Sequence, residues 1–336
     1  MNQPAQNHKG ERRRLRLVSA PPQETTGEYL ERWLRGRRSL RPATVRSYEG
    51  HIRRHLIPHI GQVPLEHLSV EQLDAMFDAL LDPDQDRPLS VATVHRVHAT
   101  LHCALKSAVK HDLIERNAAA LVELPAVVGS RTPSWSPAEL AEFLQAAVDS
   151  PLHTLFALLG LRGLRRGEAL RLRWRNVDLD KLEVHIVEQL TFHNGVEVFG
   201  PPKSKSGRRF VAIDEQLARM LYLHGCRQRL TAKTNGWSVD DHKCVFTDDD
   251  GGPLKPVSVT RHFYTLVERH GLRRIRLHDL RHTSASIGLA SGETLLEVSR
   301  RLGHSSVAIT ADIYSDISVE TAHTSAERLS AYLRDQ

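Results

Sequence analysis

One β-rich block interrupts an otherwise helical sequence, and this block limits the folds that the chain can adopt. Between Leu182 and Ile213, the segments LEVHIVEQL, VEVFG and RRFVAI are rich in β-branched and aromatic residues. The pair Asn194-Gly195 and the stretch PPKSKSG separate them with turn residues. We therefore predict a three-stranded antiparallel sheet in a mainly α protein with a small antiparallel sheet, of the α+β class.

The length of the chain predicts two domains, because 336 residues are too many for one ordinary core. Residues 1–23 are polar and basic, and we expect them to be disordered. The sequence favours equally two roles for this segment, an arm that binds DNA and a tail that only keeps the protein in solution. Residues 24–118 form a predicted helical domain, residues 119–133 a linker with Pro, Gly and Ser, and residues 134–336 a mixed second domain.

Membrane and export signals are missing from the sequence. No apolar run approaches the roughly 20 residues that span a bilayer, and the basic N-terminus lacks the apolar region of a secretory signal. The three cysteines, Cys103, Cys226 and Cys244, have no metal-binding spacing and suggest a reducing compartment. We expect a soluble cytoplasmic protein without a membrane partner.

Capping residues mark where several helices should begin. Ser69 with Gln72 three residues later is a capping box, and Ser136 with Glu139 is a second one, with Pro137 at the first helical position. Helices are expected again after Asp214. These signals place a helix from Ser69 to about Leu80 and open the second domain with another.

Basic side chains lie off the apolar stripes of the first domain. The stripes run at helical spacing from Val45 to Leu56 and from Val94 to Val109. The basic residues beside them are Arg46, Arg53, Arg54, Arg96 and Lys106. One such face is usually only solvated, but its repetition over two helices, with a net charge of +6 and a pI of about 9.4, favours a surface that faces DNA.

Four short blocks of the second domain carry groups that suit phosphate chemistry. They are GLRRGE, KSKSGRR, HDLRHT and LGHSS, and a tyrosine follows ten residues after the histidine of the last block. Each block is weak alone, but their order makes the chain resemble a tyrosine recombinase of the phage integrase family from about residue 24 to about residue 320. The resemblance implies a two-domain architecture, with a SAM-like core-binding domain at 24–118 and a catalytic domain at 134–336.

The resemblance implies a role for each residue of these blocks. Tyr314 would attack a DNA phosphate and form a 3′-phosphotyrosyl bond, which a 5′-hydroxyl later resolves. Planar guanidinium groups bind phosphate oxygens in pairs, and the clamp would be Arg165 and Arg281. His278 would assist proton transfer at the tyrosine, and His304 would hydrogen-bond the phosphate.

A lysine between two strands would protonate the leaving 5′ oxygen, because an alkoxide leaves poorly. Lys205 precedes a Ser-Gly and a basic pair, which matches the family pattern, and Lys203 is the alternative. Glu168, one turn after Arg165, would hold the structure around that arginine without contacting the phosphate. The site is rich in cations and poor in clustered carboxylates, so it implies neither a metal nor any other cofactor.

The register of the motif separates five neighbouring arginines. The sequence Gly167-Glu168 after the second G-L-R triplet assigns the clamp to Arg165. Arg162 is then expected at the surface or on the DNA backbone, and Arg166, Arg171 and Arg173 on the exposed side of the same helix or its exit.

The resemblance implies a site-specific recombinase that integrates or excises a mobile element. Its partners would be double-stranded DNA and three further copies of the chain in a tetramer, with a directionality factor as a further candidate. Relaxation of supercoils by a type IB topoisomerase and DNA binding by an inactive regulator are alternatives. After Tyr314, apolar residues at helical spacing from Val319 to Leu333 predict a helix, packed either on its own domain or on a neighbouring copy.

Overall fold

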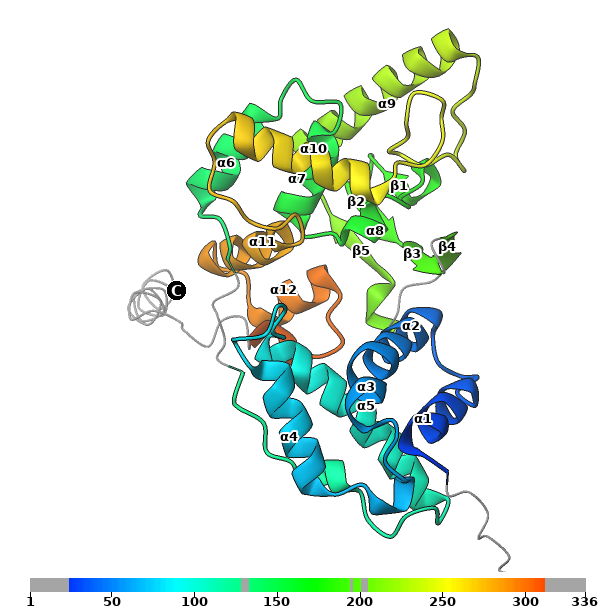
Figure 1. Cartoon of the computed structure of the whole chain (residues 1–336). Coiled ribbons are helices and arrows are strands. Elements are labelled where there is room, and N and C mark those ends of the chain that lie inside the picture. The colour runs from blue at the N-terminus through cyan, green and yellow to red at the C-terminus, as the bar shows by residue number, and fades with distance from the viewer. Residues whose placement is uncertain (1–23, 128–132, 194–195, 201–204, 312–336) are drawn as a thin grey trace, which may run out of the picture. The chain divides into compact units, whose positions relative to one another are not determined.

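The chain forms two compact units, Met1–Val128 and Gly129–Gln336. The structure is a computed structural model that describes residues 24–127, 133–193, 196–200 and 205–311 (Figure 1). The boundary between the units lies inside the segment predicted as a linker. The mainly helical fold with small antiparallel sheets confirms the predicted fold class. Among the described residues, no helix is both long and apolar enough to cross a membrane.

Unit 1 is helical throughout its described part. Its helices are α1 (Thr26–Arg35), α2 (Pro42–His51), α3 (Ile57–Ile60), α4 (Val70–Leu81) and α5 (Val91–Lys110), with short helical turns at Ile52–Leu56, Leu65–His67 and Ala118–Ala120. The turn between α2 and α3 is π-helical, and the N–H of Ile57 donates to the carbonyl of Ile52 across it. This wider turn lies directly before Pro58, which has no N–H to continue an α-helical ladder.

The predicted helix signals of unit 1 are confirmed. Ser69 caps α4 in a capping box with Gln72, and Ser90 caps α5. The stripe of α5 is buried from Val94 to Leu105 and packs with α1, the α2–α3 region and α4 in one core. The hydroxyl of Tyr29 donates to the carbonyl of Ala104 at 2.7 Å and ties α1 to α5.

Unit 2 combines helices with two small sheets. The helices are α6 (Pro137–Ala146), α7 (His153–Arg162), α8 (Arg166–Ala169), α9 (Glu215–Asn235), α10 (Pro256–Arg269), α11 (Asp279–Ala290), α12 (Leu295–Leu302) and α13 (Ala308–Ala311). Ser136 caps α6 in a capping box with Glu139, and Asp214 caps α9, as their positions in the sequence predicted. Further short turns lie at Trp174–Asn176 and Lys205–Gly207.

The prediction of one three-stranded sheet from the β-rich block is wrong. The strands are β1 (Val177–Asp178), β2 (Glu183–Ile186), β3 (Gln189–His193), β4 (Val196–Gly200) and β5 (Arg209–Ala212). They form one antiparallel sheet in the order β1-β2-β5 and a separate β3-β4 hairpin. The segment LEVHIVEQL is divided between β2 and β3, because the chain leaves the first sheet after Ile186.

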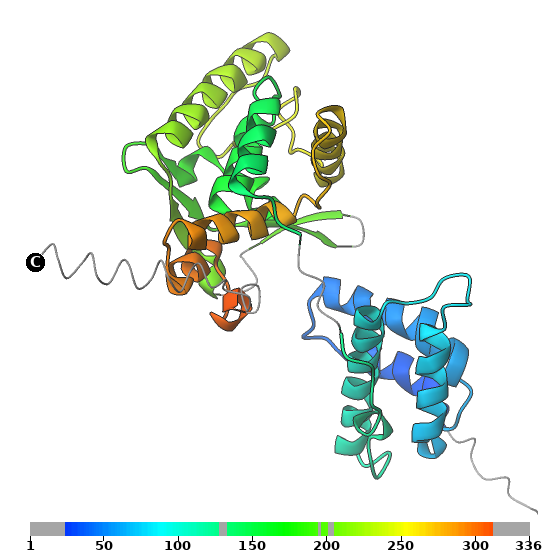
Figure 2. The ribbon, with the colours of Figure 1, turned by 90° about the vertical axis from the view of Figure 1, so that its left-hand side faces the viewer.

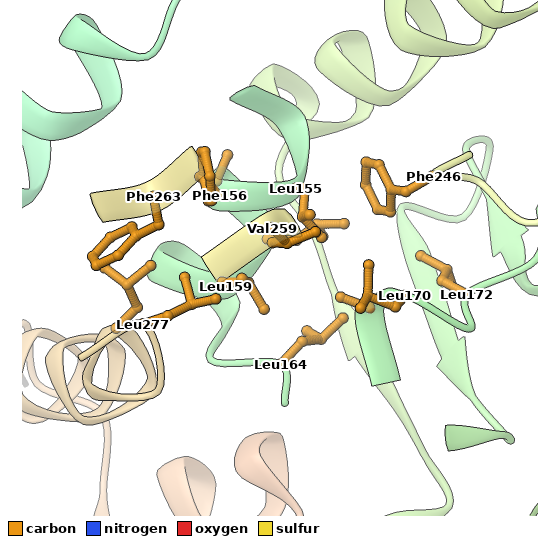
Figure 3. Packing of buried hydrophobic residues seen from close by; sticks show 14 of the residues in the cluster. Leu155, Phe156, Leu159, Leu164, Leu170, Leu172, Phe246, Val259, Phe263 and Leu277 are labelled. Atoms are coloured by element: carbon orange, nitrogen blue, oxygen red, sulfur yellow. The ribbon is translucent and has the colours of Figure 1, made fainter. Parts of the chain in front are cut away.

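Aromatic side chains of α6, α7 and α10 form one part of the core of unit 2. Figure 3 shows Phe156 of α7 beside Phe263 of α10, whose ring centroids lie 6.0 Å apart. Phe143 and Trp135 complete this aromatic group. Trp135 also donates its backbone N–H to the hydroxyl of Thr283 at 2.9 Å, so the start of unit 2 is anchored to α11.

Helices α7, α11 and α12 come together at the edge of this core. Helix α11 packs on α7, and α12 packs on α11, which both ribbon views show (Figures 1 and 2). Helix α12 also packs against β5. The ends of α7 and β5 therefore meet α11 and α12, which come more than 60 residues later in the sequence.

Candidate active site

The turn between α7 and α8 places the GLRRGE motif against α11 and α12. Helix α7 ends at Gly163, whose backbone is left-handed with φ of +68°. A side chain at this position would collide with Leu302 and Ser284, so glycine permits the close approach of α12 and α11. Leu164 is buried, and Arg165 takes the N-cap position of α8.

Glu168 is a buried carboxylate that holds two arginine side chains. Its Oε1 accepts a hydrogen bond from Nη1 of Arg165 at 2.7 Å, and its Oε2 accepts the backbone N–H of that residue at 2.9 Å. Arg209 donates Nη2 to Oε2 at 3.0 Å and Nη1 to Oε1 at 3.2 Å. Burial alone would raise the pKa of Glu168, but the hydrogen bonds and charge of Arg209 and the charge of Arg165 outweigh it and lower the pKa.

Arg281 and Arg165 reach two successive carbonyls at the end of α12. Arg281, only 4% exposed, donates Nη1 to the carbonyl of Gly163 at 2.7 Å and Nη2 to that of Leu302 at 2.6 Å. Arg165 donates Nη2 to the carbonyl of Gly303 at 3.1 Å. Burial and the charge of Arg165 lower the pKa of Arg281 to about 9, so Arg281 remains cationic at neutral pH. Two converging guanidinium groups can bind the oxygens of one phosphate.

Two histidines border this pair of arginines. His278 is the N-cap of α11, exposed to solvent, and its ring contacts that of His282 edge-on at 5.6 Å. His304 follows Gly303, is half-buried, and its Nδ1 lies 2.8 Å from the hydroxyl of Thr310. The hydroxyl can donate to Nδ1, which leaves Nε2–H of a neutral ring as a donor for another group.

Both histidines are neutral at physiological pH. Desolvation by the surrounding protein is the main cause that lowers the pKa of His278 to about 4, and the charges of His282 and Arg281 add to it. Part of the side chain of His278 is nevertheless in contact with solvent. Burial, then the charges of Arg281 and Arg165, lower the pKa of His304 to about 4 as well. A neutral His278 can accept a proton, as the role implied for it requires.

The lysine and tyrosine positions are only partly covered by the structure. Lys205 begins the helical turn Lys205–Gly207, but the position of its side chain is outside the described part. A Cβ on Gly303 would lie 2.8 Å from the carbonyl oxygen of Ser206, so this turn passes directly beside the end of α12. Lys203, Tyr314 and the predicted C-terminal helix lie outside the described residues, as does the basic segment 1–23.

Two of the arginines near Arg165 differ from their predicted positions, and a third is held by an ion pair. Arg162 is half-buried, with a side chain that is 22% exposed, and it pairs with Asp214 at the start of α9. Its contact with the DNA backbone stays a prediction. Arg171 and Arg173 do not line an exposed face, since both donate to Glu188 and are only 14% and 19% exposed. Helix α8 ends at Ala169, so these two residues lie in the turns that lead to β1.

Other basic residues do lie at the surface as predicted. Arg166 is exposed and donates to the hydroxyl of Thr260 at 2.7 Å. In unit 1, the exposed residues of the predicted DNA-facing surface are Arg53, Arg54, Arg96 and Lys106, whereas Arg46 is half-buried. Arg53 pairs with Glu49 one turn earlier at 2.8 Å. Contact of these residues with DNA stays a prediction.

Sequence reasoning missed two residues of the cluster, Arg209 and Thr310. Arg209 belongs to the basic pair Arg208-Arg209, which follows the turn Lys205–Gly207, called the lysine turn below. Nothing in the sequence of that pair distinguishes Arg209 from Arg208. Thr310 lies six residues after His304, and its side chain is fully buried. In the described part of the chain, no three His, Cys, Asp or Glu side chains are grouped so that they could hold a metal ion.

Comparison with known families matches both units. Residues 136–321 match the family described as "Phage integrase family", and residues 25–81 match "Phage integrase, N-terminal SAM-like domain". The ICEBs1 integrase of Bacillus subtilis is 27% identical over 243 residues, which cover 72% of this chain and 66% of that protein. An integrase of Streptomyces ambofaciens is 27% identical over 306 residues, which cover 89% and 78%.

Solved structures share the fold. The integrase of transposon Tn1549, in complex with a circular intermediate DNA, superimposes with a TM-score of 0.78 at 20% identity, and the match covers 91% of this chain and 99% of that one. A lambda integrase tetramer bound to a Holliday junction gives a TM-score of 0.61 at 18% identity over 86% of this chain and 77% of that one.

Proposed function

Because the chain belongs to the phage integrase family and is a site-specific tyrosine recombinase, we propose that it cuts and rejoins double-stranded DNA at the cluster around Arg165. The observation that carries this proposal is the convergence of Arg165 and Arg281 on the carbonyls of Gly303 and Leu302. It supports a clamp for one scissile phosphate, because each guanidinium keeps further N–H donors for phosphate oxygens.

Tyr314 is the nucleophile in this proposal. Its hydroxyl oxygen attacks the phosphorus, the bond to the 5′ oxygen breaks, and a 3′-phosphotyrosyl bond retains the energy of the broken linkage. His278 assists removal of the tyrosine proton, and its neutral ring suits that role. Lys205, or Lys203 in its place, protonates the leaving 5′ oxygen. A 5′-hydroxyl of the partner duplex then reverses these steps and closes the new strand.

His304 and the clamp arginines stabilise the transition state. The attacked phosphate gains negative charge on its non-bridging oxygens, and groups that are already oriented there stabilise it most. Arg165 and Arg281 supply positive charge, and His304 supplies Nε2–H when the Thr310 hydroxyl donates to its Nδ1. Glu168 keeps Arg165 in place. No metal or other cofactor is required by these steps.

Each of the two units has its own role in this proposal. We assign residues 24–118 to a core-binding domain, residues 119–133 to a linker and residues 134–336 to the catalytic domain. Arg53, Arg54, Arg96 and Lys106 are exposed on two helical segments of the first domain and suit contacts with the DNA backbone. Residues 1–23 would add a basic arm.

The assembly proposed for recombination is a tetramer of this chain on two duplexes. A lambda integrase with the same fold has been solved as a tetramer bound to a Holliday junction. Relatives include integrases of a mobile element and of a mycobacterial phage, which supports integration or excision of a mobile element as the biological role. Such a substrate places the protein in the cytoplasm with the nucleoid, where a directionality factor would be a further partner.

A suicide substrate tests the nucleophile. Duplexes that bind the protein are first selected from a random-sequence pool, and a nick beside the selected site then traps the covalent adduct. The wild-type protein should form the adduct, and Tyr314→Phe should bind the duplex without forming it. Tyr222→Phe, on an exposed tyrosine of α9, is the matched control and should react normally. An adduct with Tyr314→Phe would refute the assignment, and recombination of two sites, rather than relaxation of a supercoiled plasmid alone, separates this enzyme from a topoisomerase.

A further inference from the structure

The guanidinium of Arg209 is buried in the middle of the candidate site, although no motif in the sequence indicated a role for this residue. It opens β5, and its side chain is only 7% exposed. The preceding residue, Arg208, is exposed. Burying a cation is costly unless it is paired and hydrogen-bonded, so the contacts of Arg209 require an explanation.

Three separate parts of unit 2 accept hydrogen bonds from this one side chain. Both terminal nitrogens reach the carboxylate of Glu168, which also holds Arg165. Nη1 additionally donates to the carbonyl of Gly207 at 3.1 Å, in the turn that begins with Lys205. Nε donates to the carbonyl of Arg301 at 2.6 Å, in the last turn of α12.

The end of α12 binds three arginines on three successive carbonyls. Arg209 binds the carbonyl of Arg301, Arg281 that of Leu302, and Arg165 that of Gly303. The last carbonyls of a helix lack partners within the helix and carry its partial negative charge. This end of α12 and the carboxylate of Glu168 therefore offset the repulsion among the three cations.

The lysine turn is pressed against the same end of α12. A Cβ on Gly303 would come within 2.8 Å of the carbonyl oxygen of Ser206 and 2.9 Å of Nη1 of Arg209. Because Gly303 has φ of +69° and no side chain, the turn and the Arg209 guanidinium can both pack there. Arg209 thus lies between the turn and the helix end.

We propose that Arg209 is a positioning residue, which holds the lysine-bearing turn in register with the Arg165–Glu168 pair. It does not touch the reacting phosphate in this proposal. It acts through the carbonyl of Gly207 on the turn and through Glu168 on the clamp arginine. The proposal rests on the function proposed above, in which a lysine of that turn protonates the leaving oxygen.

A substrate with a 5′-bridging sulfur distinguishes positioning from a purely structural role. In this substrate the P–S bond breaks and the thiolate leaves without taking a proton, so the lysine is not needed. Single-turnover cleavage of nicked duplexes with bridging oxygen and with bridging sulfur gives an oxygen-to-sulfur rate ratio for each variant. The ratio responds to Lys205 or Lys203, whichever of the two is the proton donor.

Arg209→Ala should lower the oxygen-to-sulfur ratio at least about tenfold relative to the wild type, because the turn loses its register. Arg209→Lys should lower it similarly, since an ammonium cannot bind Glu168 with two nitrogens and Gly207 at once. Arg208→Ala removes the same charge from the adjacent residue and should leave the ratio unchanged. An unchanged ratio in both Arg209 variants, or an equal loss in Arg208→Ala, would overturn the proposal.

Separate measurements distinguish a variant that does not fold from one that folds but has lost the proposed role. Thermal unfolding of each variant shows whether it folds, and Arg209→Lys, which keeps the charge, answers the question if Arg209→Ala does not fold. Arg165→Ala should be slow on both substrates with an unchanged ratio, because a clamp acts whichever atom leaves. If the wild-type protein forms no adduct with either substrate, the proposed function itself fails, whereas an adduct with an unchanged ratio contradicts only the role of Arg209.

Discussion

Glu168 and Arg165 are joined twice across one turn, by a side-chain contact of 2.7 Å and by a backbone N–H that donates to the same carboxylate at 2.9 Å. The two bonds fix both the backbone and the guanidinium of Arg165, the residue proposed to clamp the phosphate. Glu168→Gln keeps the shape of the side chain but replaces one acceptor with a donor that faces cationic N–H groups. Arg165 should then lose its orientation, whereas the DNA contacts proposed for unit 1 should be unaffected.

We expect Glu168→Gln to lower the rate of adduct formation by roughly 10 to 100-fold and to change DNA affinity little, by analogy with residues that orient a ligand from behind. Single-turnover cleavage and a gel-shift titration measure the two quantities. Glu188→Gln is the matched control, because Glu188 also accepts from arginines of unit 2 but from different ones. A larger loss of cleavage in the control would contradict the role of Glu168.

Arg162 and Arg165 are three residues apart, but their substitution should affect different properties, stability for Arg162 and cleavage for Arg165. Arg162 pairs with Asp214, which also caps α9, so Arg162→Ala should lower the free energy of unfolding by about 0.5 to 1 kcal/mol, discounted because both partners contact solvent. Its cleavage rate, measured on folded protein, should stay within about threefold of the wild type. Arg165→Ala should instead lose cleavage by at least about 100-fold. Urea unfolding and single-turnover cleavage test both variants, and a reversal of the two patterns would refute the motif register.

Local signals in the sequence predicted the helices well, because their causes are local. Ser69 with Gln72 and Ser136 with Glu139 satisfy free N–H groups within one turn, so the residues that cause the cap are adjacent in sequence. The pairing of the strands depends instead on contacts made far away. Glu188 lies between β2 and β3 and pairs with three arginines that precede β1. No local sequence pattern predicts that the strand is interrupted at this position.

The inward direction of Arg209 could not be predicted for a similar reason. Alternation along β5 puts Arg209 and Val211 on one face and Phe210 on the other, and hydrophobicity alone does not decide between these faces, because each carries an apolar side chain. The register opposite β2, with Arg209 beside Ile186, places Phe210 at 59% exposure and the arginine inside. The buried carboxylate of Glu168 and the end of α12 make that arrangement favourable, and both are distant in the sequence.

Thr310 should determine how His304 presents its ring to the DNA. Its hydroxyl lies 2.8 Å from Nδ1 and can donate to it, so that Nε2 carries the proton of the neutral ring. Thr310→Val has a similar shape but no hydroxyl, and the ring loses this constraint. We expect adduct formation to slow by roughly 10-fold, in the range of other residues that orient a functional histidine. Thr283→Val, a buried threonine that binds the backbone of Trp135 instead, is the control and should alter stability more than the cleavage rate.

Stability should fall when the pH is lowered from about 6.5 towards 5, a range in which carboxylates with an ordinary pKa stay mostly ionised. Folding lowers the pKa of His278 and His304 from the value of 6.5 to about 4, so in this window the unfolded chain binds protons that the folded chain does not. The stabilisation is therefore complete above pH 6.5 and is lost as the pH falls towards 4. Urea unfolding midpoints at pH 7, 6 and 5 should decrease in that order.

His304→Asn should make this pH dependence shallower, because one group that takes up a proton on unfolding is gone. One histidine can contribute at most about 1.4 kcal/mol per pH unit, and we expect less for a half-buried ring. His270→Asn, which removes an exposed histidine at the end of α10, controls for the substitution itself and should leave the slope as it is in the wild type. A slope that is unaffected by His304→Asn would show that His304 is not held neutral by its burial and by the cations beside it.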